Sequence, residues 1–260
     1  MLRSLKDLER YTITATDGDV GLVVNFLFDD QHWTVRHLVA DTGGYFGGHQ
    51  VLISPISFRN ADWANQRLHV GLTREMIKRS PGVNTDKPFS RQHESEYYSY
   101  YGYPYYWGYS NIWGMSDDAS LLAGGPALAS PVGNSNHAPF DVHLRSVNEV
   151  RGYHIRGSDG ALGHVHDFIV DDRTWQIRYL IIDTSNWWLG KKVLLAPSWA
   201  TSVSWVNQAV DIQMSRDAIK RCPEWDPTEG VNHEYEMRLY DYYGRPAYWT
   251  APTPPSTHPL

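Results

Sequence analysis

Two histidines lie two residues apart, at His164 and His166, a spacing that could supply half of a metal site. In a β-strand such residues point to the same face. Zinc needs three or four protein ligands, however, and the matching positions in the first half of the chain hold Leu22 and Val24. We therefore interpret the histidines as a solvent-facing strand pair and expect no metal site.

Acidic residues recur in pairs that could act as acid catalysts or as calcium ligands. They stand at Asp29-Asp30 and Asp171-Asp172, and Asp-Gly steps stand at Asp17-Gly18 and Asp159-Gly160. Their spacing does not fit a calcium loop of alternating carboxylates. Asp and Gly are also the residues that hairpin turns require, so we interpret these positions as turns.

A His-Glu-x-Glu pattern occurs twice, as His93-Glu-Ser-Glu96 and His233-Glu-Tyr-Glu236. Histidine and carboxylate side chains could form a catalytic pair, but no nucleophile or third partner stands nearby in the sequence. The pattern also differs from His-Glu-x-x-His, which places two zinc ligands on one helical face. We interpret it as the polar start of an aromatic arm.

Two further motifs lack the partners that their chemistry needs. The single cysteine, Cys222, has no accompanying catalytic signature, and we expect an inert thiol, although the adjacent Lys220-Arg221 leaves oxidation open. The loop Gly43–Gly48 is rich in glycine but lacks the Gly-Lys-Ser/Thr ending of a phosphate-binding loop. With no catalytic set in the chain, we expect that it is not an enzyme and binds no cofactor.

Composition narrows the class of protein further. The 260 residues carry a formal net charge of -6, whereas a nucleic-acid-binding protein would show a basic footprint. One cysteine rules out an internal disulfide framework. No apolar run approaches the roughly 18 residues of a membrane helix, and the N-terminus is charged and amphipathic, unlike a signal peptide. We expect a cytoplasmic protein.

The elements that must position these residues occur twice. An offset of 142 positions makes about 29 of the 80 residues from Leu2 to Pro81 identical to the later ones, without a gap. The match returns where Tyr100–Trp107 mirrors Tyr242–Trp249. The chain is thus two units of ordinary domain size rather than a solenoid.

The expected domains follow from this repeat. Repeat 1 with its Tyr-rich arm spans 1–107, of which about 1–81 is the barrel, and repeat 2 with its aromatic arm spans 142–249, with its barrel at about 143–223. Residues 108–141, rich in Gly, Ser, Ala, Pro and Asn, are expected to be a flexible linker. Residues 250–260 are expected to be a disordered tail.

Each unit reads as a short capped helical turn followed by strands. Ser4 and Ser146 are the expected caps of that turn, and Thr73 is the expected cap of a later helix through Arg79. About six short antiparallel strands in 70 residues predict a small barrel or sandwich, and closure would remove exposed edges. In the first unit the expected strands run over 11–16, 20–28, 33–41, 50–53, 56–62 and 67–72.

Each unit resembles a PRC-barrel domain through an ordered set of motifs that occurs twice. The set comprises Leu-Arg-Ser at 2–4 and 144–146, Asp-Gly-x-x-Gly at 17–21 and 159–163, Phe-x-x-Asp-Asp-x-x-Trp at 26–33 and 168–175, Arg-x-Leu-x-x-Asp-Thr at 36–42 and 178–184, Val-Leu-x-x-Pro at 51–55 and 193–197, and Ile-Lys-Arg-x-Pro at 77–81 and 219–223. The resemblance implies a mainly β fold of two small antiparallel β-barrels with short flanking helices. It also implies a bacterial interaction module, in some members associated with stress.

Aromatic residues are the expected contact surface. Tyr and Trp are enriched at protein interfaces. The candidates are two loop pairs and the ends of the two arms, namely Tyr45, Phe46, Trp187, Trp188, Tyr105, Trp107, Tyr248 and Trp249. The Tyr-rich arm leaves three interpretations open, which are packing on a barrel, partner binding and ligand stacking.

We expect a non-enzymatic adaptor or assembly module whose two barrels pair face to face within the chain, in a pseudo-twofold manner. Its partners would be another protein or a second copy of itself, with no nucleic acid and no membrane span. Two alternatives stay open. One is a small-ligand or metal-binding protein, which the 12 His residues and abundant aromatics suggest. The other is a ribosome-assembly partner, by analogy with a family member that acts in ribosome maturation.

Overall fold

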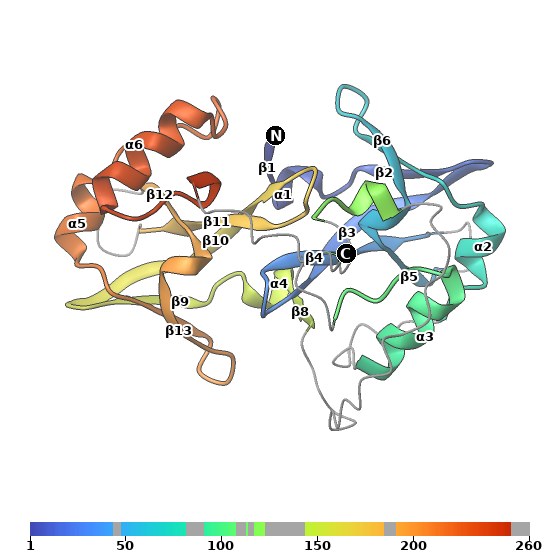
Figure 1. Cartoon of the computed structure of the whole chain (residues 1–260), viewed down its shortest axis with the longest axis horizontal. Coiled ribbons are helices and arrows are strands. Elements are labelled where there is room, and N and C mark those ends of the chain that lie inside the picture. Colours follow the sequence, from blue (N-terminus) through green and yellow to red (C-terminus); the bar gives the residue numbers. More distant parts are fainter. Residues whose placement is uncertain are drawn as a thin grey trace, which may run out of the picture.

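The computed structural model describes residues 1–43, 48–81, 91–107, 113, 117–122, 144–184 and 191–250 of the chain. This part forms two seven-stranded sheets that lie beside each other along the long axis of the molecule (Figure 1). Each sheet belongs mainly to one repeat, which we call the first unit (1–107) and the second unit (142–249). The helices that follow each sheet in sequence lie at the two ends of the molecule (Figure 1).

The elements of the two units follow one another in the same order. The first unit contains β1 (Leu2–Ser4), α1 (Leu5–Leu8), β2 (Thr12–Ala15), β3 (Gly18–Asp29), β4 (Thr34–Asp41), β5 (Gln50–Ile53), η1 (Pro55–Ser57), β6 (Phe58–Asp62), β7 (Arg67–Val70), α2 (Arg74–Lys78) and α3 (Arg91–Tyr101), and η2 (Ala119–Leu122) follows it. The second unit contains β8 (Leu144–Ser146), α4 (Val147–Val150), β9 (His154–Gly157), β10 (Gly160–Asp171), β11 (Ile177–Asp183), β12 (Lys192–Leu195), η3 (Pro197–Trp199), β13 (Ala200–Ser204), β14 (Ala209–Ile212), α5 (Arg216–Arg221), α6 (His233–Tyr243) and η4 (Tyr248–Thr250).

The expected pair of closed antiparallel barrels is wrong in two respects, although the mainly β content is confirmed. The first sheet runs β5-β4-β3-β2-β7-β6 and the second β12-β11-β10-β9-β14-β13, and neither closes on itself. The pairs β2–β7 and β9–β14 are parallel, so both sheets are mixed. Turn residues specify each hairpin locally, but the strand against which a hairpin docks is a long-range choice that they do not encode. A 3-10 turn that begins at Pro55 or Pro197 turns the chain between the two edge strands, and proline has no N–H for a ladder.

The local signals of the sequence are confirmed at the helix starts and turns. Ser4 and Ser146 accept hydrogen bonds from the N–H groups of Asp7 and Glu149, and Thr73 accepts one from Met76. The acidic turn residues likewise accept from the backbone: Asp29 from residues 31 and 32, and Asp171 from residues 173 and 174.

Glycine 21 and its counterpart Gly163 are required by the close approach of two chains. A Cβ atom on Gly21 would lie 2.1 Å from the carbonyl oxygen of Asp41, and one on Gly163 would lie 2.1 Å from that of Asp183. Gly163 also has a φ of 136°, a conformation that side-chain-bearing residues avoid. The second glycine of the Asp-Gly-x-x-Gly motif therefore permits the contact between the long strand and the end of its neighbour.

The two units exchange their first strands. β1 of the first unit pairs with β10 of the second, and β8 of the second unit pairs with β3 of the first. Thr34 forms a β-bridge with Gln176, its own counterpart at the 142-residue offset. Since equivalent residues meet, a pseudo-twofold axis passes through this bridge and relates the two units within one chain.

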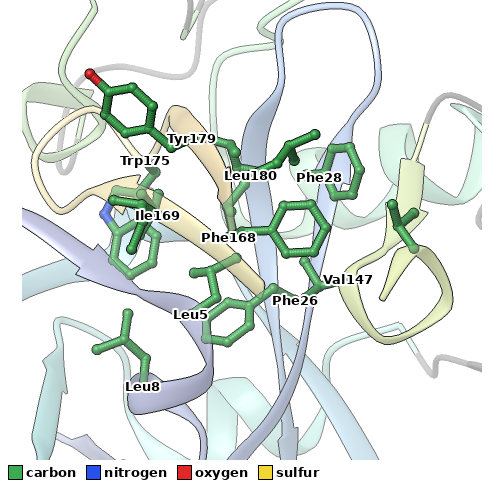
Figure 2. Packing of buried hydrophobic residues seen from close by; sticks show 14 of the residues in the cluster. Leu5, Leu8, Phe26, Phe28, Val147, Phe168, Ile169, Trp175, Tyr179 and Leu180 are labelled. Atoms are coloured by element: carbon green, nitrogen blue, oxygen red, sulfur yellow. The ribbon is translucent and has the colours of Figure 1, made fainter. Parts of the chain in front are cut away.

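One apolar core joins the two sheets across this axis. Phe28 and Phe168 lie with ring centroids 5.8 Å apart, and the exchanged helices contribute Leu5 and Val147 to the same layer (Figure 2). Burial of apolar area is the main stabilising term of a fold, so the units stabilise each other.

Two described parts of the expected linker are packed. Trp113 is fully buried, and so is Ala119 within η2. The rest of 108–141, and the tail beyond residue 250, lie outside the described residues. Among the helices of the described part, none has the length and apolar character needed to cross a membrane.

Candidate functional site

The eight aromatic candidates divide into two sets. Tyr45, Phe46, Trp187 and Trp188 lie outside the described residues, so their role stays a prediction. The other four, Tyr105, Trp107, Tyr248 and Trp249, are half-buried and pack against the core of their own unit. The structure therefore does not bring these four together into one exposed patch.

The Tyr-rich arm of the first unit begins in a helix, α3, that the sequence did not predict. Tyr97 and Tyr98 are buried, and the Tyr97 hydroxyl donates to the carbonyl of Leu52 at 3.1 Å while accepting the Ser54 N–H at 3.0 Å. Trp107 packs on Tyr98 with ring centroids 5.6 Å apart. The described part of the arm thus follows the packing interpretation.

The second arm is built in the same way. Tyr242 of α6 donates to the carbonyl of Ala218 at 2.7 Å, as Tyr100 of α3 donates to that of Met76 at 2.9 Å. Trp249 packs on Tyr240 at 5.2 Å. In each unit the arm helix is therefore tied to the short helix that follows the sheet.

Each arm helix carries a buried glutamate in the segment interpreted from the sequence as the polar start of the arm. Glu94 is 1% exposed and Glu236 is 5% exposed. The His-Glu-x-Glu pattern had aligned the two arms with a shift of two residues, whereas the 142-residue offset places Glu94 on Glu236. Burying a carboxylate is costly unless hydrogen bonds and positive charge compensate it.

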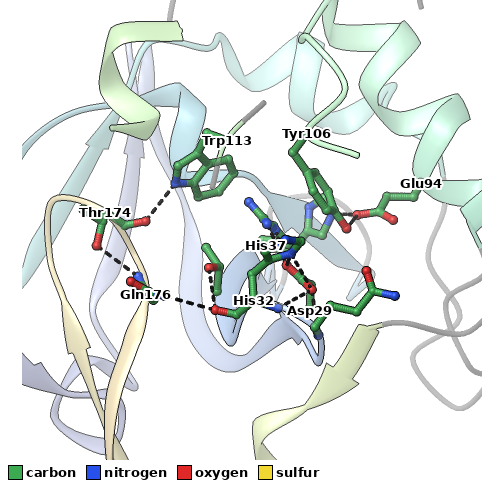
Figure 3. Close-up of polar contacts among 11 residues, drawn as sticks. Asp29, His32, His37, Glu94, Tyr106, Trp113, Thr174 and Gln176 are labelled. Atoms are coloured by element: carbon green, nitrogen blue, oxygen red, sulfur yellow. Dashed lines mark hydrogen bonds and ion pairs between the residues drawn. The ribbon is translucent and has the colours of Figure 1, made fainter. Parts of the chain in front are cut away.

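In the first unit the carboxylate of Glu94 meets groups from the loop after its helix and from β4 (Figure 3). The hydroxyl of Tyr106 donates to its Oε1 atom at 2.7 Å, and Nε2 of His37 lies 3.8 Å from the same atom. The guanidinium of Arg36 stacks 3.6 Å from the centre of the Tyr106 ring. The Tyr106 ring therefore links the sheet to the arm, because it has the Arg36 guanidinium on its face and the Glu94 carboxylate at its hydroxyl.

In the second unit tyrosine replaces the histidine. Tyr179, the counterpart of His37, donates to Oε1 of Glu236 at 2.7 Å, and Tyr248 donates to it at 3.0 Å. Arg178 lies 4.0 Å from the centre of the Tyr248 ring. Burial and the neighbouring Tyr240 and Glu236 raise the pKa of Tyr179 far above its usual range, so it remains a donor.

A buried ion pair continues the first cluster toward the axis. Arg36 donates to Oδ2 of Asp29 from Nε at 3.1 Å and from Nη2 at 2.6 Å, and both side chains are buried. Burial opposes ionisation of Asp29, but hydrogen bonds from His32 and the charge of Arg36 outweigh it and hold the pKa of Asp29 well below its usual range. The Trp113 ring lies 4.7 Å from the Arg36 guanidinium and donates its N–H to the carbonyl of Thr174 in the second unit at 2.8 Å.

The buried side chains of the first-unit cluster hold elements together rather than line a cleft. Burial lowers the pKa of His37 more than the carboxylate of Glu94 raises it, so the imidazole is neutral at neutral pH. Perturbed titratable groups are candidates for catalysis mainly when they line a cleft, and His37, Asp29 and Glu94 are all buried.

An accessible surface exists instead where the two units meet. A groove of about 390 Å³, here called the aromatic groove, is lined by Phe58 and Trp63 from the first unit and by Trp175 from the second. Phe58 and Trp175 meet edge-to-face at 5.0 Å, and Arg3 lies 3.4 Å from the centre of the Trp63 ring. Sequence reasoning missed this groove because its walls come from residues far apart in the chain.

The remaining sequence candidates are placed as follows. β10 has an irregularity between Val165 and Asp167 against β11, and His166 lies within it. Within the described ranges no three His, Cys, Asp or Glu side chains gather as a metal site would require. Burial raises the pKa of the Cys222 thiol, which favours its unreactive protonated form.

Residues 143–213, which span the second sheet, match the family model of the PRC-barrel domain. The chain therefore contains a PRC-barrel domain in its second unit. The first unit lies outside this match. No curated protein matches the chain.

Proposed function

We propose that the protein is a non-enzymatic protein-interaction module made of two PRC-barrel domains, in which the first unit is a second copy of the matched domain. The 29 identities over 80 aligned positions support this duplication. The exchange of β1 and β8 supports treating both copies as one binding unit. A single cysteine, typical of proteins that need no oxidising compartment, supports a cytoplasmic location.

The aromatic groove is the observation that carries the proposal. Trp, Tyr and Arg dominate the energetic centres of protein interfaces. The groove offers half-buried Phe58 and Trp63 beside the ring of Trp175, with the exposed Arg59 and Arg173 at its border. A partner protein would insert an apolar side chain between the rings and place polar groups against the two arginines.

The second unit supplies a matched surface that lacks one wall. Trp205 is the counterpart of Trp63 and carries Arg145 at 4.4 Å, as Trp63 carries Arg3. Ala200, however, stands where the first unit has Phe58. Trp63→Ala and Trp205→Ala therefore each remove an indole ring that packs against an arginine. Only Trp63→Ala removes a wall of the proposed contact.

The test is a quantitative comparison of cross-linked partners captured by three forms of the tagged full chain. We expect the wild type and Trp205→Ala to capture the same protein, and Trp63→Ala to lose it by about tenfold, the effect of about 1.4 kcal/mol at an interface centre. Equal unfolding midpoints of the two variants would exclude a folding defect. Equal capture by Trp63→Ala and Trp205→Ala would refute the groove as the contact.

A further inference from the structure

A second groove lies where β1 and α1 of the first unit meet the second unit. It encloses about 580 Å³ between α1 of the first unit, the strands β10 to β12 of the second unit and the segment 225–231. Sites for small molecules have volumes of about 300–1,000 Å³. We call it the lysine groove after Lys6 and Lys192, which approach it from different units.

Lys6, His166 and Lys192 line this groove together with Arg3. The ammonium of Lys192 lies 2.9 Å from Nε2 of His166. An ammonium can only donate, so His166 must accept with an unprotonated Nε2 and be neutral. Burial, with Lys192 and Lys6 nearby, lowers the pKa of His166, which agrees with that assignment. Neither lysine forms an ion pair with a carboxylate among the described residues.

Among the described residues, the carboxylates that line the groove form no ion pair with these lysines. Asp167 is buried and engaged by Arg151 at 3.0 Å and by the Ser4 hydroxyl at 2.5 Å. Asp7 and Glu229 are exposed to water, where charge–charge interactions are screened. Of the other cations, Arg3 is held by Asp172 at 2.9 Å. The two ammonium groups thus retain hydrogen-bond donors toward the groove.

The duplicated fold forms the equivalent region without these basic side chains. At the pseudo-equivalent place, the first unit has Val24 for His166 and Gln50 for Lys192, and α4 supplies Asn148 where α1 supplies Lys6. The same strand exchange and the same short helix form there without any of the three basic groups. The basic cluster is therefore an addition to one of two matched scaffolds.

We propose that the lysine groove binds a small organic anion, with its carboxylate, sulfonate or phosphate group between Lys6 and Lys192. Charge-assisted hydrogen bonds from ammonium groups are the stronger ones for such oxyanions. Leu8, Tyr11 and Trp225 line the groove beside the lysines and would cover an apolar body of the ligand. The lysine groove shares no lining residue with the aromatic groove, and this proposal does not depend on protein-partner binding there.

The proposal is tested by titrating the full chain with 1-naphthalenesulfonate and following backbone amide shifts by NMR. We expect saturable shifts at Lys6, His166 and Lys192, and an affinity at least about tenfold lower in Lys6→Asn/Lys192→Gln, which installs the side chains of the first unit. The control Lys78→Gln removes an exposed charge on α2 and should leave the affinity unchanged.

Uncharged 1-naphthalenemethanol is the control for nonspecific binding of the naphthalene ring. It should bind at least about tenfold more weakly than the sulfonate if the groove recognises the negative charge. The proposal is wrong if the sulfonate fails to saturate by about 10 mM. Equal affinity of the double variant and the wild type would also overturn it, as would an equal loss in Lys78→Gln. Unchanged shifts outside the groove verify that the double variant is folded.

Discussion

Arg151 lies at the centre of a charge cluster on the pseudo-twofold axis. Its Nη1 atom contacts the carboxylate of Glu9, and its Nη2 atom lies 3.0 Å from Oδ1 of Asp167. The side chains of Arg151, Glu9 and Asp167 are 19%, 25% and 3% exposed, so this cluster is largely shielded from water. Replacing Arg151 with glutamate would place three carboxylates together.

The expected cost of Arg151→Glu follows from the burial of Asp167. Removing one partner of a buried ion pair destabilises a protein by about 3–5 kcal/mol, because an uncompensated charge remains inside. The better-exposed contact with Glu9 adds about 0.5 kcal/mol. We therefore expect the free energy of unfolding to fall by about 3.5–5.5 kcal/mol, a large part of the 5–15 kcal/mol typical of folded proteins.

The pseudo-symmetry allows the stability lost in Arg151→Glu to be restored by further substitutions. Such a restoration would not be expected if the loss came from packing alone. Glu9 and Arg151 are counterparts, and so are Asn25 and Asp167. Asp167 accepts hydrogen bonds from the Ser4 hydroxyl and from the backbone N–H of Lys6. Asn25 likewise bonds to the Ser146 hydroxyl and accepts from the backbone N–H of Asn148. The fourfold exchange E9R/N25D/R151E/D167N therefore rebuilds the same cluster on the other side of the axis.

Urea unfolding, followed by tryptophan fluorescence and by circular dichroism, measures both changes. We expect the fourfold exchange to unfold within about 1 kcal/mol of the wild type, the tolerance for coupled sites. A loss below about 1 kcal/mol in Arg151→Glu would show that the cluster contributes little. A fourfold variant no more stable than Arg151→Glu would contradict the pseudo-symmetric reasoning.

Three further predictions concern the buried residues Trp113, His37 and Tyr179. Trp113→Ala should lower the free energy of unfolding by about 3–5 kcal/mol in urea, while Leu121→Ala in the same segment, which is exposed, should change it by less than about 0.5 kcal/mol. Burial lowers the pKa of His37 below its ordinary value of 6.5. The contribution of His37 to the free energy of unfolding is therefore complete above that pH, and on acidification it falls by up to about 1.4 kcal/mol per pH unit. Unfolding measured from about pH 8 to about pH 5 should show this slope, reduced in His37→Phe. Tyr179→Phe should cost about 1.5–3 kcal/mol in urea unfolding by removing a hydrogen bond to the Glu236 carboxylate.

Local features of the fold could be predicted because neighbouring residues determine them. Ser4 and Thr73 were identified as helix caps from their own hydroxyls and the residues that follow. The Asp-Gly steps and the Asp29-Asp30 turn were identified because few residue types adopt those conformations or accept those N–H groups. Strand limits were correct to within two residues, and at 56–62 a 3-10 turn takes the first two positions.

Long-range features could not be predicted in this way. The exchange of β1 and β8 leaves no mark on either strand, because a three-residue strand has the same pattern whichever sheet it joins. The burial of Glu94 was missed because its sequence neighbours are polar, and only the Tyr106 hydroxyl and Arg36 explain how it is tolerated. A signal was available, since the 142-residue offset aligns Glu94 with Glu236.

Duplication within one chain also explains where new function should be sought. In a homodimer, residues on the twofold axis meet copies of themselves, so an ion pair such as Glu9–Arg151 cannot form there. In a tandem chain that restriction is absent, because equivalent positions in the two units can carry different residues. Shared residues, such as Gly21 with Gly163, serve the common scaffold, whereas the two accessible grooves depend on residues that differ between the units. Phe58 against Ala200 and Lys192 against Gln50 are such differences, and binding by this protein should therefore respond to exchanges between units at these positions while its fold does not.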